Sequence, residues 1–518
     1  MTDLVKKVLV LGGGSAGWLT AALLAAEHGQ HGRKGLQVTV IESSETPPIG
    51  VGEGTWPSMR DTLRRIGLSE TEFVRRCHVS FKQGSRFDGW ARGIDPAQGD
   101  RYYHPFSLPV GHGDVDLVPA WLEAPAERSF ADLASPSIQV AEAGRGPKQQ
   151  QTPEFAAVAN YAYHFDAGLF GQMLREHAIQ QLGVQHVVDH VEAVLSSDDD
   201  GGIAALQTRD HGRVEADLFV DCSGLASLLI GQHFEVPLAS ARGVLFNDAA
   251  LAVQVPYAQP DAPLASCTIA TAWAKGWIWD IGLSTRRGVG CVYSRAHASE
   301  MEAQAALQAY LDATGAPAER PAPRTLRFEP GYRERFWVKN CVAIGLSSGF
   351  IEPLEASALA LVELAAARLC KELPLQRGSM DAVARRFNED FSYRWERVID
   401  FLKLHYALSA RDDSDYWRAH RSESSWPQRL RELLPLWRVR PPARHDFGRI
   451  DEVFPDASYQ YVLYGMGFRP DAAPTAAATL QAGQACFEEA ARQARRLVPA
   501  LPGHRSLIDH IHRHGLPA

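Results

Sequence analysis

The stretch "VLVLGGGSAGWLTAALLAA" (residues 8–26) decides the fold class of this chain. It begins with four apolar residues suited to a buried strand and ends in an alanine- and leucine-rich run suited to a helix. Between the two, Gly12, Gly14 and Gly17 follow the spacing G-x-G-x-x-G. Such glycines let a pyrophosphate approach the backbone where free amides and the helix dipole favour an anion.

A second strand is predicted over residues 37–41, "QVTVI", with Glu42 at its end. A carboxylate at this place accepts hydrogen bonds from ribose hydroxyls, and Glu42 lies near the usual spacing after the glycines. The stretch therefore predicts a β-α-β unit that binds a dinucleotide, without separating FAD from NAD. The predicted cofactor contacts in this unit are Gly12, Gly14, Ser15, Ala16, Gly17 and Glu42.

Two later stretches repeat the pattern of a buried strand followed by a glycine turn: "ADLFVDCSGLAS" (216–227) and "NCVAIGLSSGF" (340–350). Late strands that return to the cofactor are typical of FAD monooxygenases, so Gly345 and Gly349 are further predicted cofactor contacts. An aromatic hydroxylase usually carries Gly-Asp after the second of these strands. The chain has Gly345-Leu346 there, which counts against a hydroxylase.

Composition excludes several classes of protein. The net charge of -8 gives no electrostatic footprint for nucleic acid. Seven scattered cysteines without a C-x-x-C pair argue against a disulfide scaffold or a thiolate zinc site, and favour a reducing, cytoplasmic location. The glycines interrupt the only signal-like run, and no uninterrupted apolar run reaches the roughly 20 residues that a membrane span needs.

Further along the chain, we expect helix over about 55–81 and an insertion with long loops over about 93–154. Residues 184–210 suggest a β-hairpin across an acidic turn. A helix is predicted over about 354–372, with its start near Pro353. The last 140 residues are expected to be mostly helical.

The stretch "AKGWIWDIGL" (274–283) places two tryptophans one residue apart. On a strand, Trp277, Trp279 and Ile281 share one face, and Ile278 and Asp280 share the other. The two indoles either fill a core or wall off a compartment.

Taken in order, several stretches resemble the flavin-dependent tryptophan halogenase family, and the resemblance covers most of the chain. They are "LVLGGGSAGWLTA" (9–21), "IGVGEGTWPSM" (49–59), "SFKQGSRFDGW" (80–90), "YHFDAGLFGQMLREHA" (163–178), "KGWIWDIGL" (275–283), "NCVAIGLSSGFIEPLEAS" (340–357) and "FLKLHYALSARDDSDYW" (401–417). The resemblance implies an α/β fold: a Rossmann-like, FAD-binding monooxygenase fold with an added, mostly helical substrate module. Its FAD domain would comprise residues 1–100 and 155–375, and its substrate module residues 101–154 and 376–518.

The resemblance also implies an activity. A separate flavin reductase would supply reduced FAD, and oxygen and halide would give hypohalous acid, which halogenates an indole or another electron-rich aromatic. The alternatives are an FAD-dependent aromatic hydroxylase and a flavin-binding protein without turnover. The oligomeric state stays open, with a homodimer as one option, and neither the choice of chloride or bromide nor the regiochemistry is legible.

Lys82 matches the catalytic lysine of the family. A buried ammonium can hydrogen-bond hypohalous acid or form a haloamine, and a lysine suits either role because it is a compact donor; the alternative is a solvated surface lysine. Glu355 matches the second catalytic residue, which polarises the acid or removes the proton from the arene, with Glu352 as a competitor.

The family places halide near the backbone of Ser357 and Ala358, at the start of a helix whose amides attract anions; the alternative is a capped helix without a ligand. Trp277 and Trp279 match a motif thought to keep substrate away from the flavin. His104 and Phe106 fall where the family sandwiches an indole, or they pack in a core.

The chain departs from the family in three respects. Gly282 stands where the family usually has Pro, and Ala356 where it commonly has Ser. The stretch 454–468 resembles the substrate lid only loosely, and we find no set of residues that grips the amine and carboxylate of free tryptophan.

Overall fold

The computed structural model describes residues 4–29, 35–45, 52–94, 99–125, 127–471 and 475–517. Residues 49–51 of one family motif therefore lie outside the described residues. The chain divides into two compact units, each assembled from three separate segments. Unit 1 contains residues 1–77, 165–241 and 329–395, and unit 2 contains residues 78–164, 242–328 and 396–518. No helix in the described ranges is long and apolar enough to cross a membrane.

Unit 1 is built on a six-stranded sheet with the order β20-β21-β12-β1-β2-β8. Its strands are β1 (Lys7–Leu11), β2 (Gln37–Glu42), β8 (Gln185–Val188), β12 (Leu218–Asp221), β20 (Trp337–Val338) and β21 (Cys341–Ala343). All neighbouring pairs are parallel except β20 with β21. The predicted β-α-β unit and the return of the two late strands to it are both confirmed.

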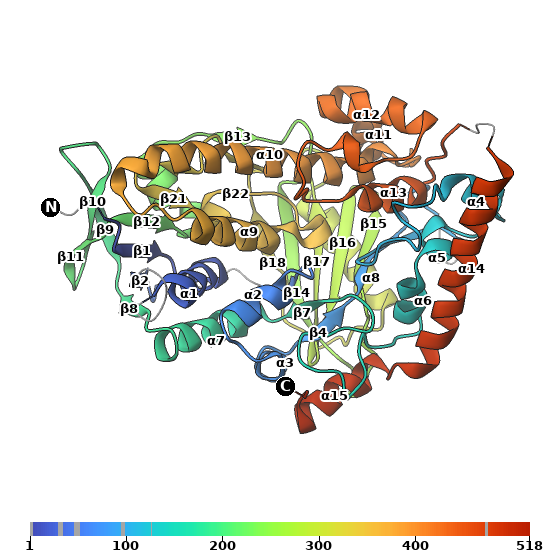
Figure 1. Cartoon of the computed structure of the whole chain (residues 1–518), viewed down its shortest axis with the longest axis horizontal. Coiled ribbons are helices and arrows are strands. Elements are labelled where there is room, and N and C mark those ends of the chain that lie inside the picture. Colours follow the sequence, from blue (N-terminus) through green and yellow to red (C-terminus); the bar gives the residue numbers. More distant parts are fainter. Residues whose placement is uncertain are drawn as a thin grey trace. The chain divides into compact units, whose positions relative to one another are not determined.

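Three helices pack together beside this sheet in unit 1: α1 (Ser15–His28), α7 (Ala167–Gln180) and α9 (Ser357–Glu372) (Figure 1). The predicted hairpin is formed by β9 (Val191–Ser196) and β10 (Ile203–Thr208), extended by β11 (Gly212–Glu215). The residues just before this hairpin form β8, which joins the parallel sheet instead.

Two predicted elements of unit 1 have different bounds in the structure. Residues 55–81 hold two short helices, α2 (Met59–Arg65) and α3 (Glu70–Arg76), rather than one. The later helix begins at Ser357, and residues 354–356 form a separate 3-10 turn before it. The predicted start at about residue 354 was three residues too early, because Glu355 and Ala356 both adopt left-handed backbone torsions, with φ of 63° and 55°, which no right-handed helix accommodates.

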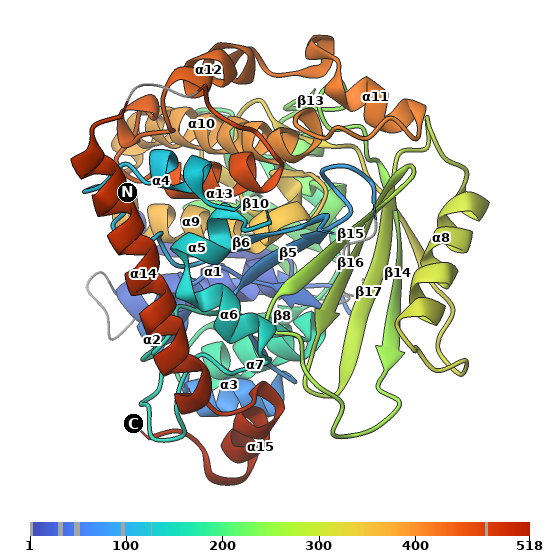
Figure 2. The ribbon, with the colours of Figure 1, turned by 90° about the vertical axis from the view of Figure 1, so that its right-hand side faces the viewer.

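Unit 2 is built on a seven-stranded sheet with the order β18-β14-β17-β16-β15-β5-β6. Its strands are β5 (Gly84–Asp88), β6 (Arg101–Pro105), β14 (Ala249–Pro256), β15 (Thr268–Trp273), β16 (Gly276–Gly282), β17 (Arg286–Tyr293) and β18 (Arg324–Arg327). Helix α8 (Glu300–Ala313) packs against β14 and β17, as Figure 2 shows.

The tryptophan stretch forms the central strand β16 of this sheet, with side chains alternating as predicted. Ile278 packs in a cluster with three side chains of α8, and Asp280 accepts a hydrogen bond from Tyr310 of the same helix. On the other face, the ring of Trp277 lies 6.1 Å from that of Trp90. The strand is buried along its whole length, so both of its faces carry core.

The insertion near residues 93–154 contains more regular structure than we expected. It holds β6 and the helices α4 (Val118–Glu123), α5 (Phe130–Ala134) and α6 (Pro136–Glu142). Elements of five to seven residues are too short to show a hydrophobic period, which is why the sequence suggested long loops.

The last 140 residues are mostly helical, as predicted. They contain α10 (Met380–Ala407), α11 (Asp415–Arg421), α12 (Gln428–Val439), α13 (Asp456–Gly465), α14 (Ala477–Ala500) and α15 (His504–His514). Within unit 2, α14 runs along α4, α5 and α6 (Figure 2).

The boundary between the two compact units falls inside α10, and the units do not coincide with the two modules expected from the sequence. Compactness does not say which part binds which molecule, so the assignment of FAD and substrate modules stays a prediction.

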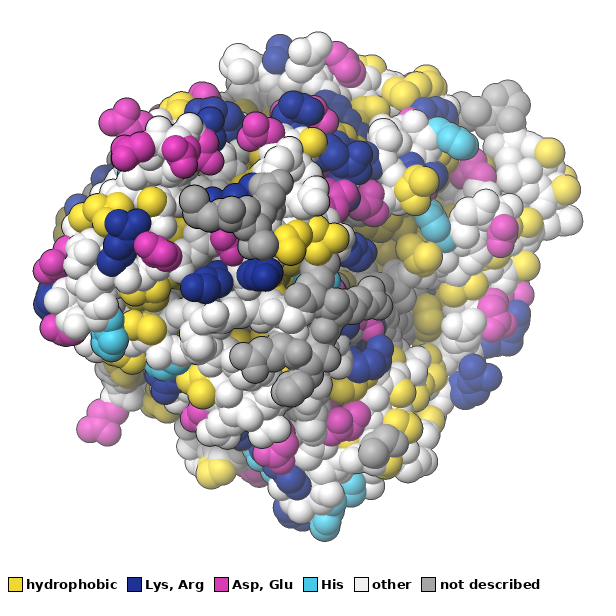
Figure 3. Space-filling view, turned by 60° about the vertical axis from the view of Figure 1, so that its left-hand side comes forward, with side chains coloured by type: hydrophobic (Ala, Val, Ile, Leu, Met, Phe, Trp, Pro, Cys, Tyr) yellow, Lys and Arg dark blue, Asp and Glu magenta, His cyan; other side chains and the backbone are white. Residues whose placement is uncertain are grey.

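On the face in view in Figure 3, acidic and basic side chains are interspersed.

Candidate active site

The glycine loop of unit 1 connects β1 to α1 and leaves no room for side chains at its tight points. Gly12 has a φ of 118°, and a Cβ there would overlap the carbonyl oxygen of Cys222. A Cβ on Gly17 would overlap the carbonyl of Gly12. A Cβ on Gly14, in contrast, would meet no atom within 4 Å. The loop is thus tight toward the protein and open at Gly14, as close approach of a pyrophosphate requires.

Glu42 ends β2 beside this loop. Its carboxylate lies where a Cβ on Gly13 would stand, and it is held by the Nε2 of His186 at 2.7 Å and by Arg175 at 3.7 Å. The carboxylate is only partly buried. It is therefore fixed in orientation and retains acceptor capacity for ribose hydroxyls.

The late strand β21 brings its glycine turn back to the same place in unit 1. A Cβ on Gly345, whose φ is 83°, would come within 2.8 Å of the Cβ of Ala16. Gly349 has a φ of 154° and would clash with the carbonyl of Gly331. Gly345 therefore lies against the N-terminus of α1. Gly349 instead begins β22 (Gly349–Phe350), which pairs with β19 (Gly331–Arg333) in a three-stranded sheet completed by β13 (Leu238–Ser240).

The residues around the glycine loop suit FAD. A glycine cradle, an open helix start at Ser15 and an oriented carboxylate supply contacts for the pyrophosphate and the ribose. A returning strand, β21, closes the site with a second glycine turn. Gly12, Gly14, Ser15, Ala16 and Glu42 would hold the dinucleotide part.

Glu355 lies in the 3-10 turn that precedes α9. Its carbonyl oxygen accepts a hydrogen bond of 2.8 Å from the indole Nε1 of Trp56, which tethers the turn to the residues before α2. Two consecutive non-glycine residues with left-handed torsions, Glu355 and Ala356, cost about 1–2 kcal/mol each. Such strain persists only where the surroundings enforce it, and it is concentrated at functional sites. Glu352 is also buried in this unit.

Ser357 and Ala358 are the first two residues of α9. The first amides of any α-helix have no partner inside the helix, and the dipole makes this end attractive to anions. No side chain caps the helix. The predicted halide contacts therefore stand where backbone amides are available.

Two carboxyls of unit 1 that the sequence did not single out have raised pKa values. Glu363, on α9, accepts hydrogen bonds from Thr62 at 2.6 Å and from Ser58 at 3.3 Å, and burial raises its pKa to about 8. Burial also raises the pKa of Glu53 to about 7. Both carboxyls therefore retain protons in neutral solution to an extent that exposed glutamates do not. Glu53 lies in one of the stretches that resemble the family, whereas nothing in the sequence pointed to Glu363.

In unit 2, Lys82 ends the short strand β4 (Ser80–Lys82), which pairs with β7 (Ala162–Phe165). The side chain is completely buried, at 0% exposure, so the solvated-lysine alternative was wrong. Its Nζ lies 5.3 Å from the centroid of the Phe106 ring. An ammonium at this distance from an aromatic ring is attracted to it, more strongly when both are desolvated.

Of the predicted aromatic pair, Phe106 lies beside the Lys82 ammonium. His104 lies on β6 and its Nε2 is 2.8 Å from the Oγ of Ser458 on α13. Its ring contacts Phe401 and Tyr461, at 5.5 Å and 6.4 Å between centroids. His104 is thus held by the C-terminal helices, with 6% of its surface exposed.

Two further histidines stand close to Lys82, and sequence analysis missed both. His164 on β7 contacts Thr268 and Ser80, and burial, together with the charges of Lys82 and His504, holds its pKa well below the ordinary value. His504, the first residue of α15, accepts the backbone N–H of Phe81 at 2.9 Å, and burial lowers its pKa to about 4. Two neutral imidazoles beside an ammonium avoid placing several charges in one buried site.

Trp277 and Trp279 contact each other at 6.3 Å between ring centroids. Trp277 belongs to an aromatic cluster of unit 2 that also includes Trp90 and Trp417, and Trp279 packs over Gly290. The two indoles therefore do fill a core. A role as a shield for the flavin stays a prediction.

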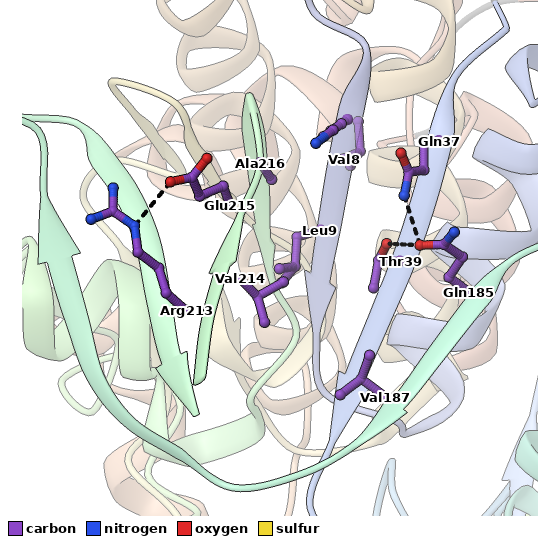
Figure 4. Close-up of a pocket in the computed structure, with 11 residues that line it drawn as sticks. Val8, Leu9, Gln37, Thr39, Gln185, Val187, Arg213, Val214, Glu215 and Ala216 are labelled. Atoms are coloured by element: carbon purple, nitrogen blue, oxygen red, sulfur yellow. Dashed lines mark hydrogen bonds and ion pairs between the residues drawn. The ribbon is translucent and has the colours of Figure 1, made fainter. Parts of the chain in front are cut away.

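A pocket of about 330 Å³ opens in unit 1 between the parallel sheet and the β9-β10-β11 sheet (Figure 4). Gln185 accepts hydrogen bonds there from Gln37 and Thr39, and Arg213 pairs with Glu215. None of the predicted site residues lines it. This pocket is separate from the glycine cradle and from the Glu355 turn.

The fold and the cradle of unit 1 define a flavoprotein of the FAD-dependent monooxygenase type, to which an unusual turn at Glu355 and a buried lysine are added. Comparison with known proteins assigns the family. The family model described as tryptophan halogenase matches residues 7–481, and this chain belongs to that family.

Similar proteins of this family span the whole chain. Tryptophan 6-halogenase SttH of Streptomyces toxytricini is 34% identical over 96% of both chains. Tryptophan 7-halogenase RebH of Lentzea aerocolonigenes is 32% identical over 99% of this chain and 100% of its own. The crystal structure of tryptophan halogenase from Shewanella frigidimarina has a TM-score of 0.94 and 44% identity, with 99% of each chain covered.

The protein is therefore an FAD-dependent halogenase, an oxidoreductase that uses halide and halogenates an aromatic compound. The aromatic hydroxylase and the flavin-binding protein without turnover are not favoured by these relatives. A small aromatic substrate and a separate flavin reductase are the general arrangement in this family.

Proposed function

We propose that this halogenase acts on the indole ring of tryptophan or of a close indole derivative, with Lys82 delivering the halogen and Glu355 assisting. The observation that carries the proposal is the complete burial of the Lys82 ammonium beside the Phe106 ring. An ammonium removed from water can hold hypohalous acid or a halogen at one position, which a solvated lysine cannot do.

Bound FAD supplies the oxidising chemistry that turns halide into hypohalous acid. The rest is the task of this chain's residues. The Lys82 ammonium donates a hydrogen bond to the acid, or, after losing a proton, its amine takes the halogen and water leaves. The neutral imidazoles of His164 and His504 add no competing charge. Phe106 gives the ammonium an aromatic, water-poor side.

Glu355 is proposed to accept the proton that leaves the halogenated ring, or to polarise the acid. Its backbone is fixed by the bond from Trp56 and by its left-handed torsion, so the direction of its carboxyl is set before substrate binds. Ser357 and Ala358, two residues further on, are proposed to bind halide through their amides.

The substrate is proposed from the relatives, several of which are named as tryptophan halogenases. His104 and Phe106 are proposed to contact the indole. A cytoplasmic location and a homodimer remain predictions, and light scattering on the purified protein tests the latter.

Product mass tests the proposal directly. The protein is incubated with FAD, a flavin reductase, NADH and either bromide or chloride, and with tryptophan or indole in separate reactions. We expect a product heavier by one halogen in place of one hydrogen, formed only when halide is present. A gain of one oxygen instead, with or without halide, would replace the halogenase by a hydroxylase.

A further inference from the structure

A second, larger pocket lies in unit 2, away from the residues proposed above. Its volume is about 1130 Å³, comparable to the sites that hold whole small molecules. It is lined by β6, the helices α4 to α6, the end of α13 and one side of α14. We call it the α14 groove and define it by Tyr103, Trp121, Tyr464, Arg469 and Arg495.

The α14 groove and His104 lie on opposite faces of β6. Tyr103 lines the groove, and its hydroxyl donates to Glu142 of α6 at 2.7 Å. Because successive side chains of a strand point to opposite faces, His104 turns away from the groove toward Ser458 and Phe401. The groove is therefore a separate site rather than an extension of the surroundings of His104.

The floor of the groove contains a polar group whose hydrogen-bonding capacity is unused. Tyr464 is 4% exposed, with its ring 4.6 Å from that of Trp121 and 4.9 Å from that of Phe130. Within the described ranges its hydroxyl has no hydrogen-bond partner. Leaving a buried hydroxyl without a hydrogen bond costs about 1–3 kcal/mol, so a ligand atom that accepts a hydrogen bond from it recovers that energy.

The charges that line the groove favour an anion. Three of its four carboxylates accept hydrogen bonds: Asp100 from the amides of residues 91–94, Asp132 from the Ser129 hydroxyl, and Glu142 from Tyr103. The fourth, Glu127, is exposed to solvent. Arg128, Arg469 and Arg495 line the groove and form no ion pair with the residues that the structure describes.

The apolar part of the groove comes from α14 and from Trp121. Ala491, Ala494 and Val498 lie on one side of this helix and line the groove. The guanidinium of Arg469 stacks over Trp121, and its Cζ lies 5.0 Å from the centroid of the indole ring. An apolar wall beside several arginines fits a molecule with a hydrophobic body and one carboxylate, because a guanidinium binds a carboxylate through two parallel hydrogen bonds.

We propose that the α14 groove binds a hydrophobic molecule that carries a carboxylate. Arg469 and Arg495 hold the carboxylate, and a polar atom of the ligand accepts a hydrogen bond from the Tyr464 hydroxyl. The body of the ligand is either an aromatic ring or an aliphatic chain. This site is independent of the halogenation proposed above, because none of the groove residues has a part in that chemistry.

Isothermal titration calorimetry on the full chain tests the groove with three probes: indole-3-acetate, octanoate and indole. We expect one of the two carboxylates to bind at least 10-fold more tightly than indole, and the better one identifies the kind of body. Arg495→Ala should weaken that binding at least 10-fold, whereas Arg496→Ala, the adjacent arginine that does not line the groove, should leave it unchanged. Tyr464→Phe should weaken it about 2- to 10-fold.

Equal effects of the Arg495 and Arg496 variants, or equal binding of indole and the carboxylates, would overturn the proposal. Arg469→Ala repeats the test should the Arg495 variant have a lowered Tm. Product formation is measured in parallel. A protein that binds the carboxylate without halogenating any substrate would overturn the proposed function and still support the carboxylate site in the α14 groove.

Discussion

The two compact units differ in whether they bury glutamate or lysine side chains, although both bury aspartates. Within the described residues, every buried glutamate belongs to unit 1: Glu70, Glu352, Glu355 and Glu363. Every buried lysine belongs to unit 2: Lys82, Lys148 and Lys403. Each of these lysines lies over an aromatic ring, at 5.3, 5.1 and 4.8 Å.

The difference shows two solutions to one physical problem. A buried carboxyl avoids the desolvation of a charge by keeping its proton, as Glu363 does. The buried lysines of unit 2 instead have aromatic faces beside them and neutral histidines nearby, such as His164 and His420. Buried glutamates and buried lysines thus lie in different units. The predictions below test that difference from the largest expected effect to the smallest.

The largest effect is expected for Lys82→Met, which keeps the volume and removes the ammonium. Halogenation should fall at least 1000-fold, or about 4 kcal/mol in transition-state stabilisation, measured as product formed per minute. FAD affinity should stay within 2-fold because the cradle lies in unit 1.

Lys148→Met is the matched control for this variant. Lys148 is equally buried and stacked, over Tyr161, and its Nζ donates to the carbonyl of Pro153. It should retain activity within a few-fold. Equal loss of activity in both variants would show that Lys82 has a structural rather than a catalytic role.

Glu355→Gln should reduce product formation about 100-fold, because an amide cannot accept the proton that leaves the arene. Glu352→Gln, three residues earlier and also buried, should reduce it less than 10-fold. The rates of both variants are compared at saturating halide and substrate. A larger loss for Glu352→Gln than for Glu355→Gln would assign the proton-accepting role to Glu352.

Acid should destabilise unit 2 through its buried histidines. The pKa of His504 is lowered to about 4, so between pH 6.5 and 4 the unfolded chain binds a proton that the folded chain does not. Stability therefore falls as the pH drops through this window, by about 1.4 kcal/mol per pH unit for this one group. His504→Gln should reduce the fall in Tm between pH 7 and pH 5, and an unchanged fall would remove His504 as its source.

Alkaline pH should destabilise unit 1 through Glu363. Its pKa is raised to about 8, so between pH 4.5 and 8 the folded chain keeps a proton that the unfolded chain has released. Stability from this group is complete below pH 4.5 and is lost as the pH rises to 8. Glu363→Gln should raise Tm at pH 8 by more than at pH 6, the difference corresponding to about 1–2 kcal/mol. Equal shifts at both pH values would contradict a protonated Glu363.

The smallest effect is expected for Trp56→Phe. This change deletes the hydrogen bond to the carbonyl of Glu355 and keeps an aromatic ring, so unfolding should become easier by about 1 kcal/mol in a urea titration. Activity should fall more than stability suggests, because the left-handed turn loses its tether. Loss of stability without loss of activity would show that the turn keeps its shape unaided.

Part of the candidate site was predictable from the sequence because its signals are local. Gly12, Gly17 and Gly345 are needed for backbone torsions and close approaches that only glycine allows, and their spacing is visible in the chain. The alternation around Trp277 was predictable for the same reason, since a strand has a period of two.

The start of α9 was mispredicted, because a proline suggested a first turn that the left-handed residues Glu355 and Ala356 exclude. No propensity scale favours two such torsions in succession. The surroundings enforce them, among them Trp56, which is 299 positions away in the sequence.

By itself, the sequence determined the parallel sheet, the glycine cradle, the residues that match the halogenase family and the helical C-terminus. These follow from torsional preferences and periodicities that neighbouring residues encode together. Tertiary structure alone decided that Lys82 is fully buried, that Glu363 retains its proton and that Tyr464 lies in an arginine-lined groove. Burial and pKa depend on atoms supplied by distant segments, as when Thr62 donates to Glu363 across 301 positions of the chain.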